Sequence, residues 1–101
     1  MTPDATTKMV GPVVRGADAE MADAIIEAIE IDNPDKEILV DDQRGYIRVS
    51  CQGECRLTRK TLSEVLDHEV DISEIEPALS AFAGRIRMTD DAIVWYLERE
   101  D

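Results

Sequence analysis

The sequence predicts an α+β fold built from antiparallel sheets and about three helices. Segments with the two-residue period of strands and segments with the helical period follow one another in the order β-α-β-β-β and then α-α-β-β. Strands and helices are therefore interspersed, but no repeated βαβ units favour a parallel sheet. The 101 residues, 44% of them hydrophobic, are enough for one domain with a buried core.

The N-terminal 15 residues divide into a tail and a strand. Residues 1–8 are polar and without period, so we expect a flexible tail followed by one domain over residues 9–101. Met9–Arg15 is rich in β-branched residues and predicts a strand. Because Pro12 cannot donate a hydrogen bond to a neighbouring strand, we expect an edge strand or the start of a strand here.

A helix is predicted between Asp18 and Asn33. Asp18 is a typical N-cap residue, and hydrophobic residues recur after it at the spacing of one helical face. The helix is expected to end at Asn33-Pro34, because proline disfavours the helical conformation of the residue before it.

Three strands are predicted next, at residues 37–41, 46–51 and 55–58, with a turn at residues 42–45. The last two are expected to form a hairpin.

The register of this hairpin follows from its alternating pattern. A three-residue loop at residues 52–54 places Cys51 opposite Cys55 and Val49 opposite Leu57, which keeps the apolar side chains on one face. A two-residue loop would mix the two faces, so the sequence predicts the three-residue loop.

The C-terminal half is predicted to contain two helices and a second hairpin. Thr58 or Thr61 begins a short helix that continues through Leu66. Ser73 and Glu76 have the spacing of a capping box. They open a helix that ends at Gly84, and its apolar stripe consists of Ile72, Ile75, Leu79 and Phe82.

The final hairpin is predicted from strands at residues 85–88 and 92–97 around a turn of Thr89, Asp90 and Asp91. In its second strand Ile93, Trp95 and Leu97 share the face expected in the core. Tyr96 points the other way and is expected at the rim of the core or in contact with a partner.

The charge of the chain is strongly negative and unevenly distributed. Eleven Lys and Arg stand against 23 Asp and Glu, a net charge of −12. Residues 16–42 carry ten acids and one base, residues 44–60 one acid and five bases, and residues 61–84 six acids and no Lys or Arg. The charge argues against binding to nucleic acid or anionic lipid. Stripes of this kind steer association with a partner protein, and the net charge favours a monomer in the free state.

The sequence predicts a cytoplasmic protein with reduced thiols. No segment approaches the ~20 apolar residues of a membrane span. The first eight residues contain no apolar region typical of a signal peptide. Two cysteines are too few for a disulfide framework or a four-ligand zinc site.

The residue types that carry out catalysis do not form a recognisable set. His68, the one histidine, lies between two carboxylates in a polar turn and is expected to be solvated. Cys51 and Cys55 fall on the predicted apolar face, which favours buried, inert thiols, with a cross-strand disulfide as the alternative. The pairs Asp41-Asp42 and Asp90-Asp91 lack the spacing of a calcium loop. No catalytic residue, cofactor or metal is therefore predicted.

Five stretches occur in order along the chain: Val10–Arg15, Ile31–Ile38, Gly45–Val49, Leu57–Leu62 and Phe82–Ile86. Together they resemble the small effector proteins, also called coupling or regulatory proteins, of soluble di-iron monooxygenases. This family contains the effectors of methane, phenol and toluene monooxygenases. The resemblance covers roughly residues 9–98 and is greatest to the toluene/alkene branch of four-component systems.

The resemblance implies a cofactor-free protein without an active site of its own, folded as two β-α-β-β-like halves. Such a protein binds the di-iron hydroxylase component and shifts its conformation, which promotes turnover, coupling and regiospecificity of hydrocarbon oxidation.

Candidate contacts with the hydroxylase lie in a loop, a junction and a polar face. The loop is Asn33-Pro34-Asp35-Lys36, the junction is Gly84-Arg85, and the polar face carries Arg48 and Arg56. In the alternative interpretation, Asn33-Pro34 only ends a helix and the arginines form a solvated face.

Two other functions fit the residues. One is an acidic adaptor module for protein interactions unrelated to oxygenases. The other is a small enzyme that uses His68.

Overall fold

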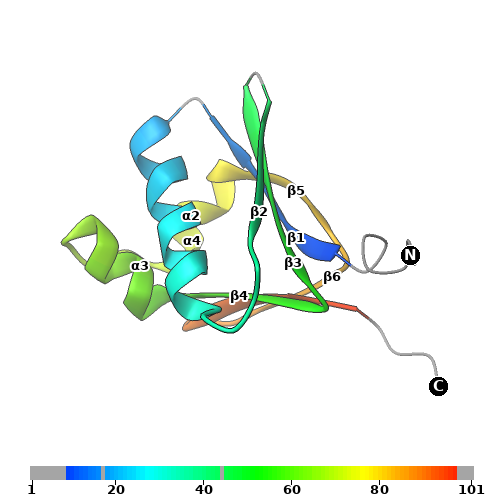
Figure 1. The fold of residues 1–101 in the computed structure, drawn as a ribbon. Coiled ribbons are helices and arrows are strands. Elements are labelled where there is room, and N and C mark those ends of the chain that lie inside the picture. Colours follow the sequence, from blue (N-terminus) through cyan, green and yellow to red (C-terminus); the bar gives the residue numbers. More distant parts are fainter. Residues whose placement is uncertain (1–8, 17, 44, 98–101) are drawn as a thin grey trace, which may run out of the picture.

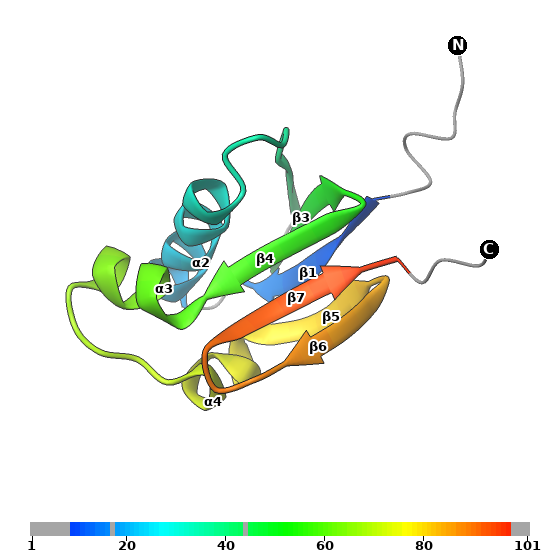
Figure 2. The same cartoon turned by 90° about the horizontal axis from the view of Figure 1, so that it is seen from below.

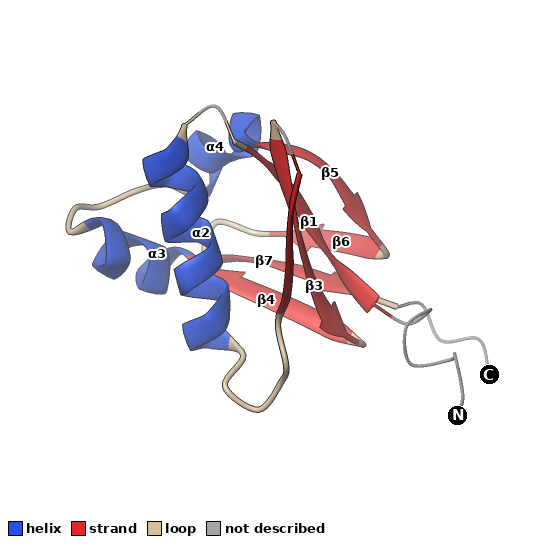
Figure 3. Cartoon of the chain, turned by 45° about the horizontal axis from the view of Figure 1, so that its top comes forward, coloured by secondary structure: helices blue, strands red, loops and turns tan. Residues whose placement is uncertain are grey.

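The fold was analysed in a computed structural model, which describes residues 9–16, 18–43 and 45–97. The predicted tail at residues 1–8 lies outside the described residues. The domain contains two antiparallel sheets, and its helices lie together on one side of the strands (Figures 1 and 3). The predicted α+β class is confirmed.

Four strands form the first sheet, in the order β2-β3-β1-β5. Their bounds are β1 (Met9–Arg15), β2 (Leu39–Gln43), β3 (Tyr46–Gln52) and β5 (Leu79–Ala83). Three strands form the second sheet, in the order β4-β7-β6. They are β4 (Glu54–Thr58), β6 (Arg85–Met88) and β7 (Ala92–Tyr96).

Three α-helices complete the described part of the chain. They are α2 (Ala19–Asp32), α3 (Arg59–Leu66) and α4 (Ile72–Ile75), the last followed by a 3-10 turn at Glu76–Ala78. The predicted caps of the two longer helices are confirmed. Asp18 Oδ1 accepts a hydrogen bond from Met21 N at 3.1 Å, and Thr58 Oγ1 accepts one from Thr61 N at 3.2 Å.

The expectation that Pro12 marks an edge strand or a strand start is wrong, because β1 lies inside the four-stranded sheet between β3 and β5. The ladder with β3 pairs Val10 with Cys51 and then Val13 with Arg48, passing over Gly11 and Pro12. On the other side, Pro12 lies opposite Phe82 of β5. The sheet accepts an internal proline because the ladder is interrupted where the N–H is missing.

The hairpin predicted from the strands at residues 46–51 and 55–58 is also wrong. β3 pairs with β1 and β2, whereas β4 pairs with β7 in the other sheet. The chain therefore changes sheets at Gly53, whose φ of +81° favours glycine. The strand predicted at residues 37–41 is found two residues later, as β2.

The predicted long helix ending at Gly84 is replaced by a short helix and a strand. α4 begins after Asp71 rather than at the proposed Ser73–Glu76 capping box. Pro77 lies in the 3-10 turn, and Leu79–Ala83 then pairs with β1. Phe82, expected in the core stripe, is 46% exposed at the sheet edge. Pairing with β1 has prevailed over a local pattern that also fits a helix.

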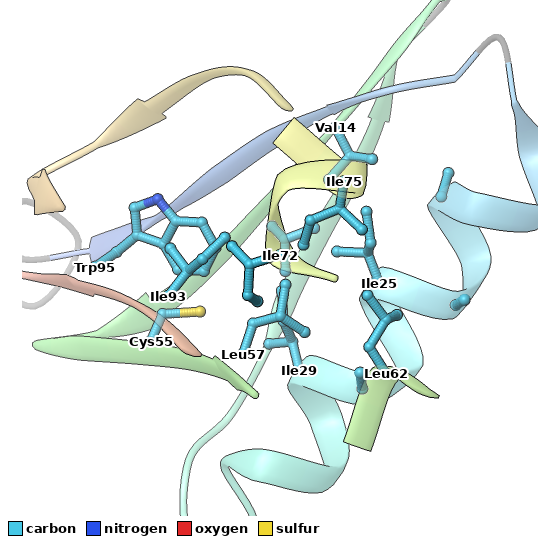
Figure 4. Packing of buried hydrophobic residues seen from close by; sticks show 14 of the residues in the cluster. Val14, Ile25, Ile29, Cys55, Leu57, Leu62, Ile72, Ile75, Ile93 and Trp95 are labelled. Atoms are coloured by element: carbon cyan, nitrogen blue, oxygen red, sulfur yellow. The ribbon is translucent and has the colours of Figure 1, made fainter. Parts of the chain in front are cut away.

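One hydrophobic core joins the two sheets and the helices. Side chains from both sheets and all three α-helices meet in it, as Figure 4 shows. Its largest fully buried side chains include Trp95, Ile25, Ile29, Leu57 and Ile75. The expected core positions Ile93 and Trp95 on β7 are confirmed.

Replacing Ile29 with Ala should lower the free energy of unfolding by about 2–5 kcal/mol, because it leaves a cavity in this core. Urea titration followed by circular dichroism measures the change. Ile31→Ala is the matched control, since Ile31 is 53% exposed on the same helix, and it should change stability by no more than about 0.5 kcal/mol. Equal losses in the two variants would contradict the packing described.

Candidate partner-binding surface

The outer face of the sheet β4-β7-β6 concentrates positive charge on an acidic protein. Cross-strand pairing sets Arg56 and Arg87 on either side of Val94, and Glu54 and Arg85 on either side of Tyr96. Directly paired residues share a face, so all six side chains point away from the core. Of the eight Lys and Arg in the described residues, three lie here. We call these six residues the arginine face; its sheet lies in front in Figure 2.

The arginine face combines charged rims with an aromatic centre. The Arg87 guanidinium carbon lies 5.4 Å from the centroid of the Tyr96 ring, a cation–π distance. Arg56 Nη2 lies 3.4 Å from Glu54 Oε2, and the side chains of this pair are 53% and 45% exposed. An exposed pair of this kind contributes little stability and can be exchanged for contacts with a partner. Arg and Tyr are also residue types enriched in protein interfaces.

The predicted loop Asn33-Pro34-Asp35-Lys36 lies against one edge of this sheet. Asn33 Nδ2 donates to Ile29 O at 2.6 Å and to Arg56 O at 2.8 Å, and Asn33 Oδ1 accepts from Arg56 N at 3.1 Å. The Asn33 residue is only 7% exposed. Its amide therefore works within the chain, joining the end of α2 to β4.

Lys36 fixes the other end of the loop. Its Nζ donates to Gln52 O and to Glu54 O, both at 2.9 Å, and so bridges the crossing between the two sheets. Pro34 and Asp35 remain exposed. Residues 32–36 together with Glu54 and Arg56 line a recess of about 180 Å³.

The opposite edge of the arginine face is shaped by Gly84. A Cβ at Gly84 would lie 2.6 Å from Val10 Cγ1 and 2.8 Å from Tyr96 O, and its φ is +92°. Only glycine fits this corner, where the chain crosses from β5 to β6. The corner brings Arg85 beside Tyr96.

Arg48 lies apart from the other predicted contacts. It belongs to the outer face of the four-stranded sheet, paired with Asp41 on one side and Val13 on the other. The structure thus brings together the loop, Arg56 and Gly84-Arg85, but not Arg48.

Sequence reasoning missed Arg87 and Val94 as members of this face. The signal was present for Arg87 in the alternation of Arg85-Ile86-Arg87-Met88, which sets both arginines on one side of the strand.

His68 and the two cysteines, which were considered for catalysis, lie in different surroundings, the histidine exposed and the cysteines buried. His68 is exposed as expected, and its Nδ1 lies 3.2 Å from Glu69 O. It borders a recess of about 620 Å³ lined by Arg59, Lys60 and four acids, among them Glu64 and Asp91. Within the described ranges, no three His, Cys, Asp or Glu side chains are grouped to hold a metal ion. Cys51 and Cys55 are buried and free, as predicted.

The described helices are also too short or too polar to cross a bilayer.

Comparison with known proteins identifies the family of this chain. Residues 8–96 match the model of the MmoB/DmpM family. A curated relative from Xanthobacter autotrophicus, "Alkene monooxygenase system, effector subunit", is 38% identical over 93 residues, which cover 92% of this chain and 90% of the relative. These two matches place the chain in a class of regulatory, non-catalytic effector proteins. The chain belongs to the MmoB/DmpM family.

Solved structures agree with this membership. Two structures of the phenol hydroxylase–regulatory protein complex contain chains 26% identical to this one, with TM-scores of 0.75 and 0.69. They cover 89% and 87% of this chain and 99% and 98% of the matched chains. The soluble methane monooxygenase regulatory protein B shares the fold, at 19% identity and a TM-score of 0.65, over 90% of this chain and 66% of its own.

Replacing Asn33 with Ala should destabilise the fold by about 1–3 kcal/mol, because the backbone groups of Arg56 and Ile29 O lose a buried partner. Asp35→Ala, in the exposed part of the same loop, is the control and should stay within about 0.5 kcal/mol of the parent. Thermal and urea unfolding would both report the difference. A neutral Asn33→Ala variant would show that the amide does not hold the loop to β4.

Proposed function

We propose that this chain is the effector subunit of a di-iron monooxygenase and that it binds the hydroxylase component through the arginine face. The observation that carries the proposal is the 38% identity, along nearly the full length of both chains, to the effector subunit of an alkene monooxygenase system. The likeness to chains in the phenol hydroxylase–regulatory protein complex supports a direct contact with the hydroxylase.

The proposed effect on the hydroxylase requires no reactive group on this chain. An effector changes a partner's activity by binding one of its conformations better than another. A tenfold shift between two conformations needs ~1.4 kcal/mol of differential binding. A few contacts on a surface the size of one sheet face can supply this difference.

Charge supports the arginine face as the docking surface. The chain carries a net charge of −12, yet Arg56, Arg85 and Arg87 share one face with Glu54 as its single acid. A partner with acidic groups around an apolar patch would be attracted to this face and repelled by the acidic remainder. Association would therefore be oriented as well as accelerated.

The other predicted contacts take different parts in this proposal. Pro34 and Asp35 are exposed beside the face and can reach the partner, while Asn33 and Lys36 hold their loop in place. Gly84 shapes the corner that presents Arg85. Arg48 lies outside the face, and its contact with a partner stays a prediction.

The function itself is tested by adding the purified chain to its hydroxylase and reductase. Product formation per NADH oxidised should rise, while the chain alone should consume no substrate. Unchanged turnover and coupling, or pull-down of a partner set without an oxygenase subunit, would favour the adaptor function instead.

The docking surface is tested with the double variant Arg56→Glu/Arg87→Glu. We expect hydroxylase binding to weaken about tenfold or more, equivalent to ~1.4 kcal/mol, and to lose part of its salt dependence. Isothermal titration calorimetry at two salt concentrations measures both effects.

The matched control is Lys60→Glu/Arg59→Glu, which makes the same change in net charge on α3. It should leave binding within about threefold of the parent, since only long-range charge is altered. Equal weakening by both double variants would indicate a nonspecific charge effect, and no weakening by either would place the docking surface elsewhere.

A further inference from the structure

We propose that the free edge of β2 pairs with an extended, basic segment of the hydroxylase component, which adds one strand to the sheet β2-β3-β1-β5. This inference rests on the proposed function and gives the chain a second contact beside the arginine face. β2 lies at one end of the sheet order, and all five of its residues are exposed. With β3 it forms the hairpin at the top of Figure 1.

The edge of β2 presents unpaired backbone groups at two positions. Gln43 is paired with Tyr46 across two loop residues, and only a hydrogen-bonded pair can close so short a loop. The alternation of an antiparallel ladder then turns the N–H and C=O groups of Asp42 and Val40 away from β3. Among the described residues, no hydrogen bond outside the ladder with β3 reaches the backbone of β2. These groups are therefore open to pairing with another strand.

The other strands at sheet edges are covered or irregular. The outward backbone groups of β4 are bonded by the side chains of Asp32, Asn33 and Lys36. β5 pairs with β1 through a shift in register between Val13 and Val14, and β6 has only four residues. β2, in contrast, contains no proline and keeps a regular register with β3 over all five pairs. A long, regular edge of this kind is the form that accepts an added strand.

The side chains of β2 define the segment that fits. Leu39 and Val40 are 47% and 45% exposed, and Asp41 and Asp42 follow them directly. Because neighbouring residues of a strand point to opposite faces, each face of the sheet carries one apolar side chain and one carboxylate at this edge. A complementary strand has apolar residues beside Leu39 and Val40 and Lys or Arg beside the two aspartates.

Asp42 is the carboxylate on which this charge complementarity chiefly depends. Asp41 lies opposite Arg48 of β3 and accepts a hydrogen bond from Gln43 Nε2 at 2.7 Å. Asp42 lies opposite Ile47, so its own sheet provides no cation across from it. A Lys or Arg on the added strand would supply the missing partner.

The same charges argue against a second copy of this chain as the occupant. Pairing between two β2 strands brings the aspartates of one copy close to those of the other, and each copy carries a net charge of −12. Acidic residues thus keep the edge from pairing with itself while leaving it open to a basic strand.

The hydroxylase is the partner within reach of this edge. β2 begins three residues after Lys36, so Leu39 lies within about 11 Å of the loop that flanks the arginine face. A large partner that covers the arginine face can therefore also extend a segment along β2. The two contacts require opposite charges on the partner, which fixes the orientation of the complex.

The experiment measures amide hydrogen–deuterium exchange of the full chain, alone and saturated with the purified hydroxylase, with fragmentation that resolves residues 39–43. We expect the amides of Val40 and Asp42 to exchange about tenfold or more slowly in the complex, because they become hydrogen-bonded. Binding without this slowing would overturn the added strand and leave the proposed function intact. Absence of binding would overturn both. Slowing in the free chain that grows with its concentration would assign the edge to a second copy and also overturn the proposal.

A proline variant separates strand pairing from simple coverage. Val40→Pro removes an N–H that points away from β3, so the ladder is retained, but the added strand loses a donor and meets the proline ring. We expect hydroxylase binding to weaken about tenfold, measured by isothermal titration calorimetry. Val40→Thr keeps the N–H and the β-branched shape, and its affinity should stay within about threefold of the parent. Equal affinities of the two variants would overturn the pairing. If Val40→Pro does not fold, the exchange measurement on the parent chain decides.

A neutralised pair of aspartates tests the basic character of the segment. Asp41→Asn/Asp42→Asn should weaken hydroxylase binding and reduce its dependence on salt concentration, because the contact with Lys or Arg is lost. The matched control, Asp23→Asn/Glu27→Gln, makes the same change in net charge at exposed positions of α2. Weakening by the β2 pair alone supports the basic segment, whereas equal effects of the two pairs, or tighter binding by the β2 pair, would overturn it.

Discussion

The side-chain amide of Asn33 is the interaction on which the position of α2 against β4 depends. Two hydrogen bonds, from its Nδ2 to Arg56 O and from Arg56 N to its Oδ1, join the end of α2 to the outer edge of β4, while a third, from Nδ2 to Ile29 O, holds the amide on α2. β4 is an edge strand, and the backbone groups of an edge strand need partners outside their own sheet. Asn33 supplies them from a nearly buried position, where a lost partner is costly.

Neighbouring side chains extend this anchor in both directions. Asp32 Oδ2 accepts from Thr58 N at 2.8 Å and from Thr58 Oγ1 at 2.9 Å, and Asp32 Oδ1 accepts from Thr61 Oγ1 at 2.7 Å. The carboxylate thereby supports the first turn of α3, where a negative charge is favourable. With Lys36 at the sheet crossing, a segment of five residues positions α2, α3 and β4 relative to one another.

Elements that depend on neighbouring residues were predictable from the sequence. The Asp18 cap, the helix through Asp32, the alternation of β3 and the last hairpin each follow from a pattern within a short window. Ile72, Ile75, Leu79 and Phe82 also fit a helical stripe, but the sequence cannot show that β1 offers a free edge to residues 79–83. The sheet exchange between β3 and β4 was missed for the same reason. β4 pairs with β7, whose first residue, Ala92, lies 34 residues after Thr58, the last residue of β4.

The candidate site shows the same limit. Arg56 and Arg85 were singled out separately, but they share a face only because β7 lies between β4 and β6. Local patterns predict which way a side chain points from its strand, whereas strand order decides which side chains become neighbours. Arg48 shows the converse, because its alternation resembles that of Arg56 while its strand belongs to the other sheet.

β7 connects the proposed binding surface to the core within a single strand. Val94 and Tyr96 point outward into the arginine face, and Ile93 and Trp95, both 0% exposed, alternate with them on the inner side. The outward residues are therefore held by a packed layer directly beneath them. A face ordered before binding loses little conformational freedom when a partner docks. More of the contact energy then remains to favour one conformation of the partner, which is the physical requirement for an effector without chemistry of its own.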